Sequence, residues 1–533
     1  MKKILLILLA FASLLIVKAN AQSIVTVSGD LSSNTSWTNN NIYILSGFVY
    51  VTNNAELTIQ EGTVIKGDKA SKGSLIITRG SKIWADGTSS QPIVFTSNEP
   101  AGLRSYGDWG GIIICGNAPI NDPAGEKVIE GGVDSNKGLY GGTNPTDNSG
   151  ILRYVRIEFP GIAFMPNNEI NGLTLGGVGS GTLIDYVMVS YSGDDSYECF
   201  GGTVNLKHIV AFRGLDDDFD TDFGYQGKCQ FLVALRDSNV ADISGSNGFE
   251  SDNDATGSTN TPITFPIYSN VTLIGPMVDA GTMINSNYKR GAHLRRSAKT
   301  SIFNSAVSGY PTGLIIDGAN SEANATNNDL QYMNNIIAGC TTPLAVASGS
   351  TWDITTWFNQ GSFANAILPN SLDLQLTNPY HYDNPSFVPL AGSPLLSNSS
   401  FSSSHLSDPF FDVVTYRGAF GSTDWTSGWA NFDCQNTNYI LTSISEHSSV
   451  KDLAVYPNPA NLRSIVTFNL TQSMQTSITL KDAQGKLVAK IYSGYLSSGS
   501  QRFPLGTSNL KSGFYILTID SEVGQTNFRL LLQ

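Results

Sequence analysis

The residues with the clearest potential for chemistry are aspartates gathered between positions 194 and 222. The pairs at 194–195 and 217–218 stand 23 residues apart, and two more aspartates follow the second pair. Carboxylates packed this closely raise one another's pKa unless a cation or hydrogen bonds compensate. Oxygen ligands from several turns suit Ca²⁺, a hard cation that takes about 6–8 oxygens. The sequence therefore predicts a calcium site formed by Asp194, Asp195, Asp217, Asp218, Asp220 and Asp222.

Further charged residues lie on the same turns or on the next one: Glu198, Arg213, Asp216, Lys228, Arg236, Glu250, Asp252 and Asp254. Carboxylates, Ca²⁺ and basic side chains are the groups of a uronate lyase, while paired aspartates near arginine suit glycoside hydrolysis. A purely structural interpretation is also available, because aspartate side chains cap turn backbone and tolerate left-handed conformations. Turn structure, a cation or saccharide site, and a catalytic site therefore remain open.

Several common kinds of chemistry lack their motifs in this chain. The five cysteines form no C-x-x-C pair, and none of the five histidines forms H-E-x-x-H. Neither the G-x-S-x-G motif nor the G-x-x-x-x-G-K phosphate loop occurs. The net charge of −13 disfavours nucleic acid as a partner, because phosphate backbones attract basic proteins. We therefore expect no zinc, nucleotide or serine-hydrolase site and no nucleic-acid partner.

The elements that must position these side chains are short β-strands in a repeating arrangement. Residues 183–189, 206–212 and 229–235 align without gaps at a spacing of 23, and 151–157 resembles them 32 residues earlier. Weaker copies follow at 270–273, 304–307 and 334–337. A period of this length with one buried strand per repeat is typical of a solenoid. We predict an all-β right-handed parallel β-helix over residues 22–434.

The 23-residue spacing also predicts the register, because stacked parallel strands lie ~4.8 Å apart. It places Val187, Val210 and Val233 in one interior column, with Val189, Phe212 and Leu235 beside it. The aspartates expected to face each other across coils are Asp194 with Asp217 and Asp195 with Asp218. The alternative fold is an antiparallel sandwich, which usually shows hairpin turns every ~8–12 residues rather than gapless long repeats.

The N-terminus has the features of a secretory signal peptide, predicted over residues 1–21. Two lysines precede an apolar run from Ile4 to Val17, and Ala19-Asn20-Ala21 forms a small-x-small cleavage site. The run is shorter than the ~20 residues that a membrane-spanning helix needs. We expect the mature chain to leave the cytoplasm and to have no membrane span after cleavage.

The C-terminal part is predicted to be a separate domain. A polar stretch at 435–448 is typical of a linker, and short apolar runs over 449–533 predict a small antiparallel Ig-like sandwich. The Tyr456-Pro457-Asn458-Pro459 entry and the Gly513-Phe514-Tyr515 strand resemble the type A C-terminal sorting domain of the Bacteroidetes type IX (Por) secretion system. The tail departs from that pattern, since it has one basic residue, Arg529, where such domains often carry lysine. The resemblance implies contact with the type IX machinery and export to the surface or the medium.

The body of the chain resembles Bacteroidetes surface proteins that have β-helix folds and no established activity. The similar stretches are 109–112, 201–204, 216–224 and 416–420. We expect an exported protein that binds polysaccharide or extracellular matrix; the alternative is a polysaccharide-cleaving lyase or glycoside hydrolase. An enzyme should show a groove walled by the inserted loops 121–149 or 238–262 with converging carboxylates and a base. A binding protein should show a flat face.

Overall fold

The computed structural model describes residues 22–165, 168–439, 450–457, 459–461, 463–482, 486–506, 510–521 and 524–532. The predicted signal peptide, most of the predicted linker, and Asn458 lie outside the described residues. The chain divides into two units, with a boundary between Tyr439 and Ile440. The first unit thus extends five residues beyond the boundary predicted at 434. Each unit is described by itself.

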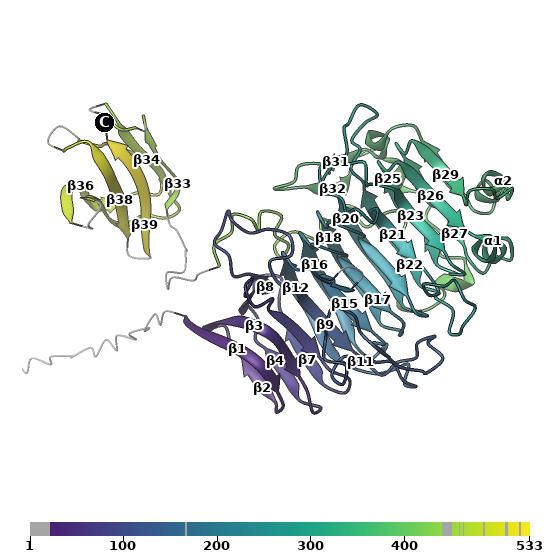
Figure 1. Cartoon of the computed structure of the whole chain (residues 1–533). Helices are drawn as coiled ribbons and strands as arrows, with labels where there is room; N and C mark the ends of the chain where they lie inside the picture. The colour runs from purple at the N-terminus through teal and green to yellow at the C-terminus, as the bar shows by residue number, and fades with distance from the viewer. Residues whose placement is uncertain are drawn as a thin grey trace, which may run out of the picture. The chain divides into compact units, whose positions relative to one another are not determined.

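The first unit is a solenoid of parallel strands arranged in three ladders (Figure 1). Strands of its first coils are β1 (Ser23–Leu31), β2 (Thr35–Trp37), β3 (Asn41–Val51), β4 (Glu56–Ile59), β5 (Val64–Gly67), β6 (Ser74–Ile77), β7 (Lys82–Asp86), β8 (Ile93–Ser97) and β9 (Gly111–Cys115). One ladder runs through β2, β4 and β7, the second through β5 and β8, and the third through β6 and β9. The predicted parallel β-helix is confirmed.

In the middle coils one long strand serves the first two ladders. These long strands are β12 (Gly150–Glu158), β16 (Leu183–Ser190), β18 (Asn205–Phe212), β20 (Lys228–Leu235) and β22 (Ile267–Ile274). Each bends at one residue with positive φ, namely Tyr154, Tyr186, His208, Phe231 and Asn270. The third ladder continues through β15 (Leu173–Gly176), β17 (Tyr197–Phe200), β19 (Phe219–Asp222), β21 (Asn247–Ser251), β23 (Arg290–Arg295), β26 (Thr312–Asp317) and β29 (Thr342–Val346). Each of these middle coils therefore contributes to all three ladders through two strands.

The last coils contain shorter elements. Their strands are β24 (Ser301–Phe303), β25 (Ala306–Ser308), β27 (Tyr332–Met333), β28 (Ile336–Ala338) and β30 (Ala366–Leu368). Helices α1 (Ala319–Thr326) and α2 (Ile354–Phe358) lie at this end of the solenoid (Figure 1). None of the helices that the structure describes is long and apolar enough to cross a bilayer.

Inserted segments and the C-terminal part of the first unit add small elements outside the ladders. These are β10 (Lys127–Val128), β11 (Leu139–Tyr140), β13 (Ile162–Met165), β14 (Asn168–Ile170), β31 (Leu376–Asn378), β32 (Ser386–Pro389), and the 3₁₀ turns η1 (Ser371–Leu374), η2 (Pro394–Leu396) and η3 (Ser404–Leu406). The pairs β10–β11, β13–β14 and β31–β32 are antiparallel.

The predicted register is wrong by one residue between β16 and β18. Val187 pairs with Ile209, and Met188 pairs with Val210, so this step is 22 residues. The next step, from β18 to β20, keeps the predicted 23. A one-residue shift moves a side chain to the other face of a strand. Val210 and Val233 therefore do not stack on Val187 in the interior.

Both faces of these long strands are buried, which explains why the pattern did not reveal the shift. The interior core contains Val187, Ile209 and Leu232. A second cluster on the outer face contains Met188, Val210 and Val233. A later segment, here called the returning chain, covers this face with Phe387, Phe420 and Trp429. With apolar residues on both faces, alternation cannot mark which one points inward.

The described part of the second unit forms two antiparallel sheets. One contains β33 (Val450–Tyr456), β34 (Ile465–Leu470) and β37 (Gly499–Pro504); the other contains β35 (Met474–Asp482), β36 (Leu487–Leu496), β38 (Gly513–Ser521) and β39 (Gly524–Leu532). Val466, Ile478 and Leu517 are among the buried residues of their shared core. This agrees with the predicted sandwich. Tyr456 is exposed and Tyr515 is buried, and their role in sorting stays a prediction.

Candidate functional site

Neighbouring strands of the third ladder carry a row of polar residues on their outer face. Glu198 of β17 pairs with Asp220 of β19, which pairs with Glu250 of β21, which pairs with His293 of β23. The residues on either side, such as Tyr197, Phe219 and Phe249, lie in the interior core. Because side chains alternate along a strand, the polar residues point away from that core. Register alone thus brings three carboxylates together.

The turns that precede these strands add more carboxylates. Asp194 and Asp195 precede β17, and Asp216 and Asp217 precede β19. The backbone N–H of Asp217 donates to Oδ1 of Asp195 over 2.8 Å, and the N–H of Asn247 donates to Asp217. These bonds fix the carboxylates of successive coils beside each other.

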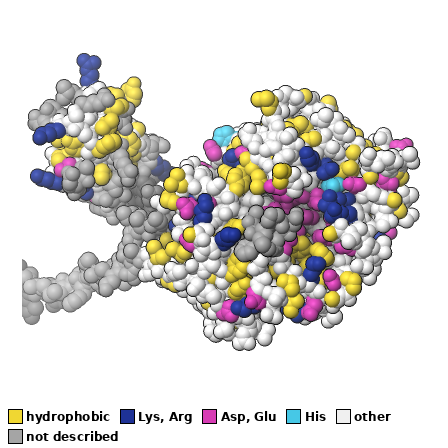
Figure 2. Space-filling model, viewed as in Figure 1, with side chains coloured by type: hydrophobic (Ala, Val, Ile, Leu, Met, Phe, Trp, Pro, Cys, Tyr) yellow, Lys and Arg dark blue, Asp and Glu magenta, His cyan; other side chains and the backbone are white. Residues whose placement is uncertain are grey.

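The carboxylates of these strands and turns line a cavity of about 310 Å³, here called the carboxylate pocket. The cavity is also lined by Glu130 from the inserted loop 121–149, Ser244 from the loop 238–262, and Glu169 from β14. Arg290 and Arg295 are its described basic residues. Figure 2 shows acidic side chains gathered on this face of the solenoid, with basic side chains and a histidine beside them. The site is therefore concave and partly walled by the inserted loops rather than flat.

Three groups of carboxylates in the pocket could hold a metal ion, since one oxygen from each member lies within 4.8 Å of the others. The groups are Asp194, Asp195 and Asp216; Asp195, Glu198 and Asp220; and Asp217, Asp220 and Glu250. Asp195 and Asp220 each belong to two groups. The groups therefore form one continuous row of possible positions.

Burial, followed by repulsion between neighbouring carboxylates, raises the pKa of most of these groups. The pKa is well above its ordinary value for Asp194, Asp195, Glu198, Asp217 and Asp220. Burial also raises the pKa of Glu130 to about 7 and that of Asp216 to about 6. Without a cation, the pocket therefore favours protonated carboxyl groups.

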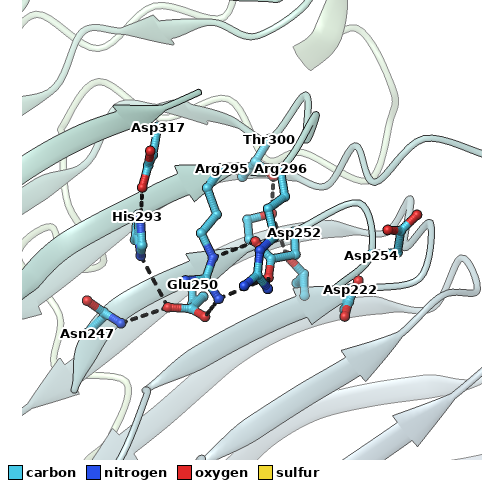
Figure 3. Close-up of polar contacts among 12 residues, drawn as sticks. Asp222, Asn247, Glu250, Asp252, Asp254, His293, Arg295, Arg296, Thr300 and Asp317 are labelled. Carbon is cyan, nitrogen blue, oxygen red and sulfur yellow. Dashed lines mark hydrogen bonds and ion pairs between the residues drawn. The ribbon is translucent and has the colours of Figure 1, made fainter. Parts of the chain in front are cut away.

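Glu250 is the exception within the pocket. Burial acts to raise the pKa of Glu250, but the hydrogen bond with His293 and the charge of Arg295 outweigh it and lower the pKa. His293 Nδ1 lies 3.3 Å from Glu250 Oε2, and Arg295 forms an ion pair with Glu250 (Figure 3). Glu250 is thus held ionised at one end of a pocket whose other carboxyls tend toward the neutral form.

Two of the six predicted ligands do not line the pocket. Asp218 points inward and forms a fully buried ion pair with Arg236 at 2.8 Å, and Tyr310 donates to its other oxygen. Asp222 accepts a hydrogen bond from the N–H of Phe223 and does not line the pocket either. The predicted facing of Asp195 with Asp218 is therefore wrong. The shorter coil places Asp217 against Asp195 instead.

Of the basic residues expected beside the aspartates, Arg236 pairs with Asp218, whereas Arg213 and Lys228 are engaged elsewhere. Arg213 pairs with Asp237, and Lys228 pairs with Asp408 at 3.0 Å. Two other arginines, Arg290 and Arg295, reach the pocket. They lie on β23, two coils after the last of the predicted aspartates. Glu130 and Glu169 come from segments outside the repeat, and no sequence signal identified them.

Family models match both parts of the chain. A model described as a pectate-lyase like beta helix domain matches residues 29–370, and one described as a secretion system C-terminal sorting domain matches residues 454–533. No curated protein matches the chain.

Two solved structures show weak similarity. The Dettilon tailspike protein (gp208) is 9% identical at a TM-score of 0.22, with 59% of this chain and 62% of that one covered. The enzymatically active domain of bacteriophage CBA120 tailspike protein 2 is also 9% identical at a TM-score of 0.22, with 92% and 72% covered. The chain thus spans less than two thirds of the Dettilon tailspike, and such TM-scores support no inference about function. The family match over residues 29–370 shows that this chain belongs to the pectate-lyase-like β-helix family, and its C-terminal sorting domain marks it for type IX export to the outer surface or the medium.

Proposed function

We propose that this exported protein binds polysaccharide at the carboxylate pocket and that Ca²⁺ held there takes part in the binding. The observation that carries the proposal is the row of three overlapping carboxylate groups that share Asp195 and Asp220. Side chains from four coils and three inserted segments converge on this row. A surface ladder of turn aspartates would leave its carboxylates in solvent instead of enclosing them.

The electrostatics of the pocket favour a divalent cation. Burial raises the pKa of Asp195, Asp217 and Asp220, so each resists ionisation in the empty pocket. A bound cation reverses this preference, because it stabilises the ionised carboxylates. Several oxygen ligands in an irregular arrangement suit Ca²⁺ better than Mg²⁺, which demands near-ideal octahedral geometry, or Zn²⁺, which favours nitrogen and sulfur.

A polysaccharide is the ligand class that agrees best with the location and shape of the site. The chain is exported, and its family is named for a lyase-like β-helix. A cavity of about 310 Å³ is at the small end of ligand pockets, so it accommodates one sugar unit of a longer chain. Sugar oxygens can complete the coordination of a calcium ion whose remaining ligands are carboxylates.

Polysaccharide cleavage is a second candidate, favoured by one observation. Glu250 has a lowered pKa while Asp220, its register neighbour, has a raised one, which is the pattern of a base paired with an acid. Their nearest oxygens, however, lie within 4.8 Å. The carboxyl groups of glycosidases are separated by roughly 5–9.5 Å, so this pair is better suited to sharing a cation.

A polysaccharide-binding screen of the chain from Gln22 onward, in Ca²⁺ and in chelator, tests the proposal. We expect retention on at least one polysaccharide in Ca²⁺ and its loss both in chelator and in the double variant Asp217→Asn, Asp220→Asn. Asp86→Asn is the matched control, because Asp86 forms an exposed pair with Arg153 far from the pocket. Polysaccharide binding that persists in chelator and in the double variant contradicts the proposal. Release of oligosaccharides from the bound polymer establishes cleavage.

A further inference from the structure

A second cavity of about 450 Å³ lies beside the carboxylate pocket. Its lining includes Arg295, Arg296 and Ser297 from the end of β23 and the turn after it, and Gly318 and Asn320 from the start of α1. Arg295 also lines the carboxylate pocket, so one guanidinium group borders both spaces. The two cavities are therefore neighbours that share a charged wall.

The turn that carries Arg296 is held in an unusual conformation. Arg296 and Ser297 have φ values of 48° and 71°, which non-glycine residues seldom adopt and which rarely occur in succession. Ser297 Oγ donates to Gly257 O over 2.8 Å and accepts from Asn320 Nδ2 over 2.9 Å, and Asn324 Nδ2 donates to Ser297 O. Such strain persists only where the surroundings enforce it, and it concentrates at ligand sites. The backbone thus fixes the arginine at the cavity.

The start of α1 gives the cavity a second positive feature. The N-cap residue is Gly318, and no side chain caps the helix. Gly318 and the first-turn residues Ala319 and Asn320 line the cavity. Uncapped N–H groups at a helix start, together with the helix dipole, attract anions. Two arginines and this helix start therefore converge on one space.

The charges of the two cavities are linked through Glu250. Arg295 pairs with Glu250 and, at 2.7 Å, with Asp252, while Arg296 pairs with Asp252 at 2.7 Å (Figure 3). Glu250 is also a member of a carboxylate group that could hold a metal ion. A cation that binds Glu250 weakens the ion pair between Glu250 and Arg295, so more of the Arg295 charge is available to the second cavity.

His293 strengthens this link. It is almost fully buried, and its two ring nitrogens contact Glu250 at 3.3 Å and Asp317 at 2.9 Å. Glu250 lines the carboxylate pocket, whereas Asp317 lines the second cavity. His293 therefore connects a carboxylate of each cavity, so a change at Glu250 acts on a side chain that also contacts Asp317.

We propose that the second cavity binds an oxyanion through Arg295, Arg296 and the start of α1, and that neutralising Glu250 strengthens this binding. The coupling to a cation rests on the proposed function, because it requires Ca²⁺ at the carboxylate pocket. The oxyanion itself is either a free ion or a charged group on a polymer. Coupling between sites usually changes affinity by about 5–150-fold and acts equally in both directions.

Sulfate is the probe, titrated by calorimetry into the chain from Gln22 onward at constant ionic strength. We expect measurable binding, at least tenfold weaker in Arg296→Gln and at least fivefold tighter in Glu250→Gln without any cation. Lys299→Gln is the matched control: it removes one positive charge three residues away, from a lysine that pairs with Asp329 and does not line the cavity. Dextran sulfate compared with neutral dextran distinguishes a polymer-borne anion from a free one.

The variants separate this inference from the proposed function. Absence of sulfate binding, or binding unaffected by Arg296→Gln or Glu250→Gln in variants that melt cooperatively, overturns the inference. If Glu250→Gln tightens sulfate binding while Ca²⁺ does not affect the wild type, the anion site stands and calcium at the carboxylate pocket fails. If Ca²⁺ tightens sulfate binding and sulfate tightens Ca²⁺ binding by the same factor, both stand.

Discussion

Asp217 and Asp218 are adjacent in the chain, yet their side chains occupy opposite environments. Asp217 contributes to the carboxylate pocket, where burial and the charges of Asp216 and Glu250 raise its pKa. Asp218 points into the solenoid, where it pairs with Arg236 and accepts from Tyr310. The same substitution at the two positions therefore removes a repulsion in one case and a buried ion pair in the other.

We expect Asp218→Asn to destabilise the first unit by about 3–5 kcal/mol, because it leaves the fully buried Arg236 without its counter-ion. Asp217→Asn is the matched variant and should leave the cation-free protein at least as stable as the wild type. Urea unfolding followed by circular dichroism in chelator measures both. Similar losses at the two positions would show that Asp217 also serves the fold.

The carboxylate pocket should also set the pH dependence of stability in the absence of a cation. Burial raises the pKa of Glu130 to about 7 and that of Asp216 to about 6, above their ordinary values. The folded state then binds these protons more tightly than the unfolded chain, so stability rises as pH falls from about 7.5 to about 5. We expect Tm in chelator to be several degrees higher at about pH 5.5 than at about pH 7.5.

The double variant Asp217→Asn, Asp220→Asn is the control for this pH dependence. It removes two of the repelling charges, so Tm should change less between the same two pH values. Differential scanning calorimetry supplies the comparison. A wild-type Tm that is constant or falls on acidification would contradict the assignment of these pKa shifts to the pocket.

Among the elements, the long strands contribute residues to two hydrophobic cores, one inside the solenoid and one on its outer face. Each of them packs its inner residues in the solenoid and its outer residues under the returning chain. Trp429 is buried in the outer cluster, and its ring contacts Tyr154 and Tyr186 edge-on at the bend of two strands. The returning chain is therefore part of the solenoid's stability.

We expect Trp429→Ala to cost about 3–5 kcal/mol, as is typical for removing a buried aromatic side chain. Trp84→Ala is the matched control, because Trp84 is only partly buried and its indole N–H donates to Glu56. Chemical denaturation and binding of a hydrophobic dye report the loss. Equal and small effects of the two substitutions would show that the returning chain is dispensable.

The repeat of apolar segments was sufficient to predict the parallel β-helix, and the short apolar runs of 449–533 were sufficient to predict the sandwich. The register was not predictable to one residue, because turns absorb single insertions without changing the strand pattern. That single residue moves Val210 from the inner core to the outer one. It also separates Asp218 from the pocket.

The candidate site was predictable only in part, for the same reason. Four of the six expected ligands, Asp194, Asp195, Asp217 and Asp220, lie in the pocket because local spacing brings them to corresponding places on successive coils. Glu130 and Glu169 come from inserted segments whose paths depend on tertiary packing. Position in a repeat gives no information about such residues.

At the scale of the whole molecule, the C-terminal sorting domain determines where the protein goes. Its described residues have a core of their own, and the family match covers residues 454–533. We expect deletion of residues 449–533 to leave the β-helix folded but retained in the periplasm. Cell fractionation and limited proteolysis measure location and folding, and a truncated chain found outside the cell would refute the prediction.

Whether the carboxylate pocket binds calcium can be measured by calorimetric titration of Ca²⁺ into the chain from Gln22 onward. We predict saturable binding, a Tm raised in Ca²⁺ by an amount that grows with its concentration, and loss of both in Asp217→Asn, Asp220→Asn. Asp86→Asn should bind as the wild type does. A flat titration with a Tm unmoved by Ca²⁺ or chelator would contradict the account and leave the carboxylates as protonated turn structure.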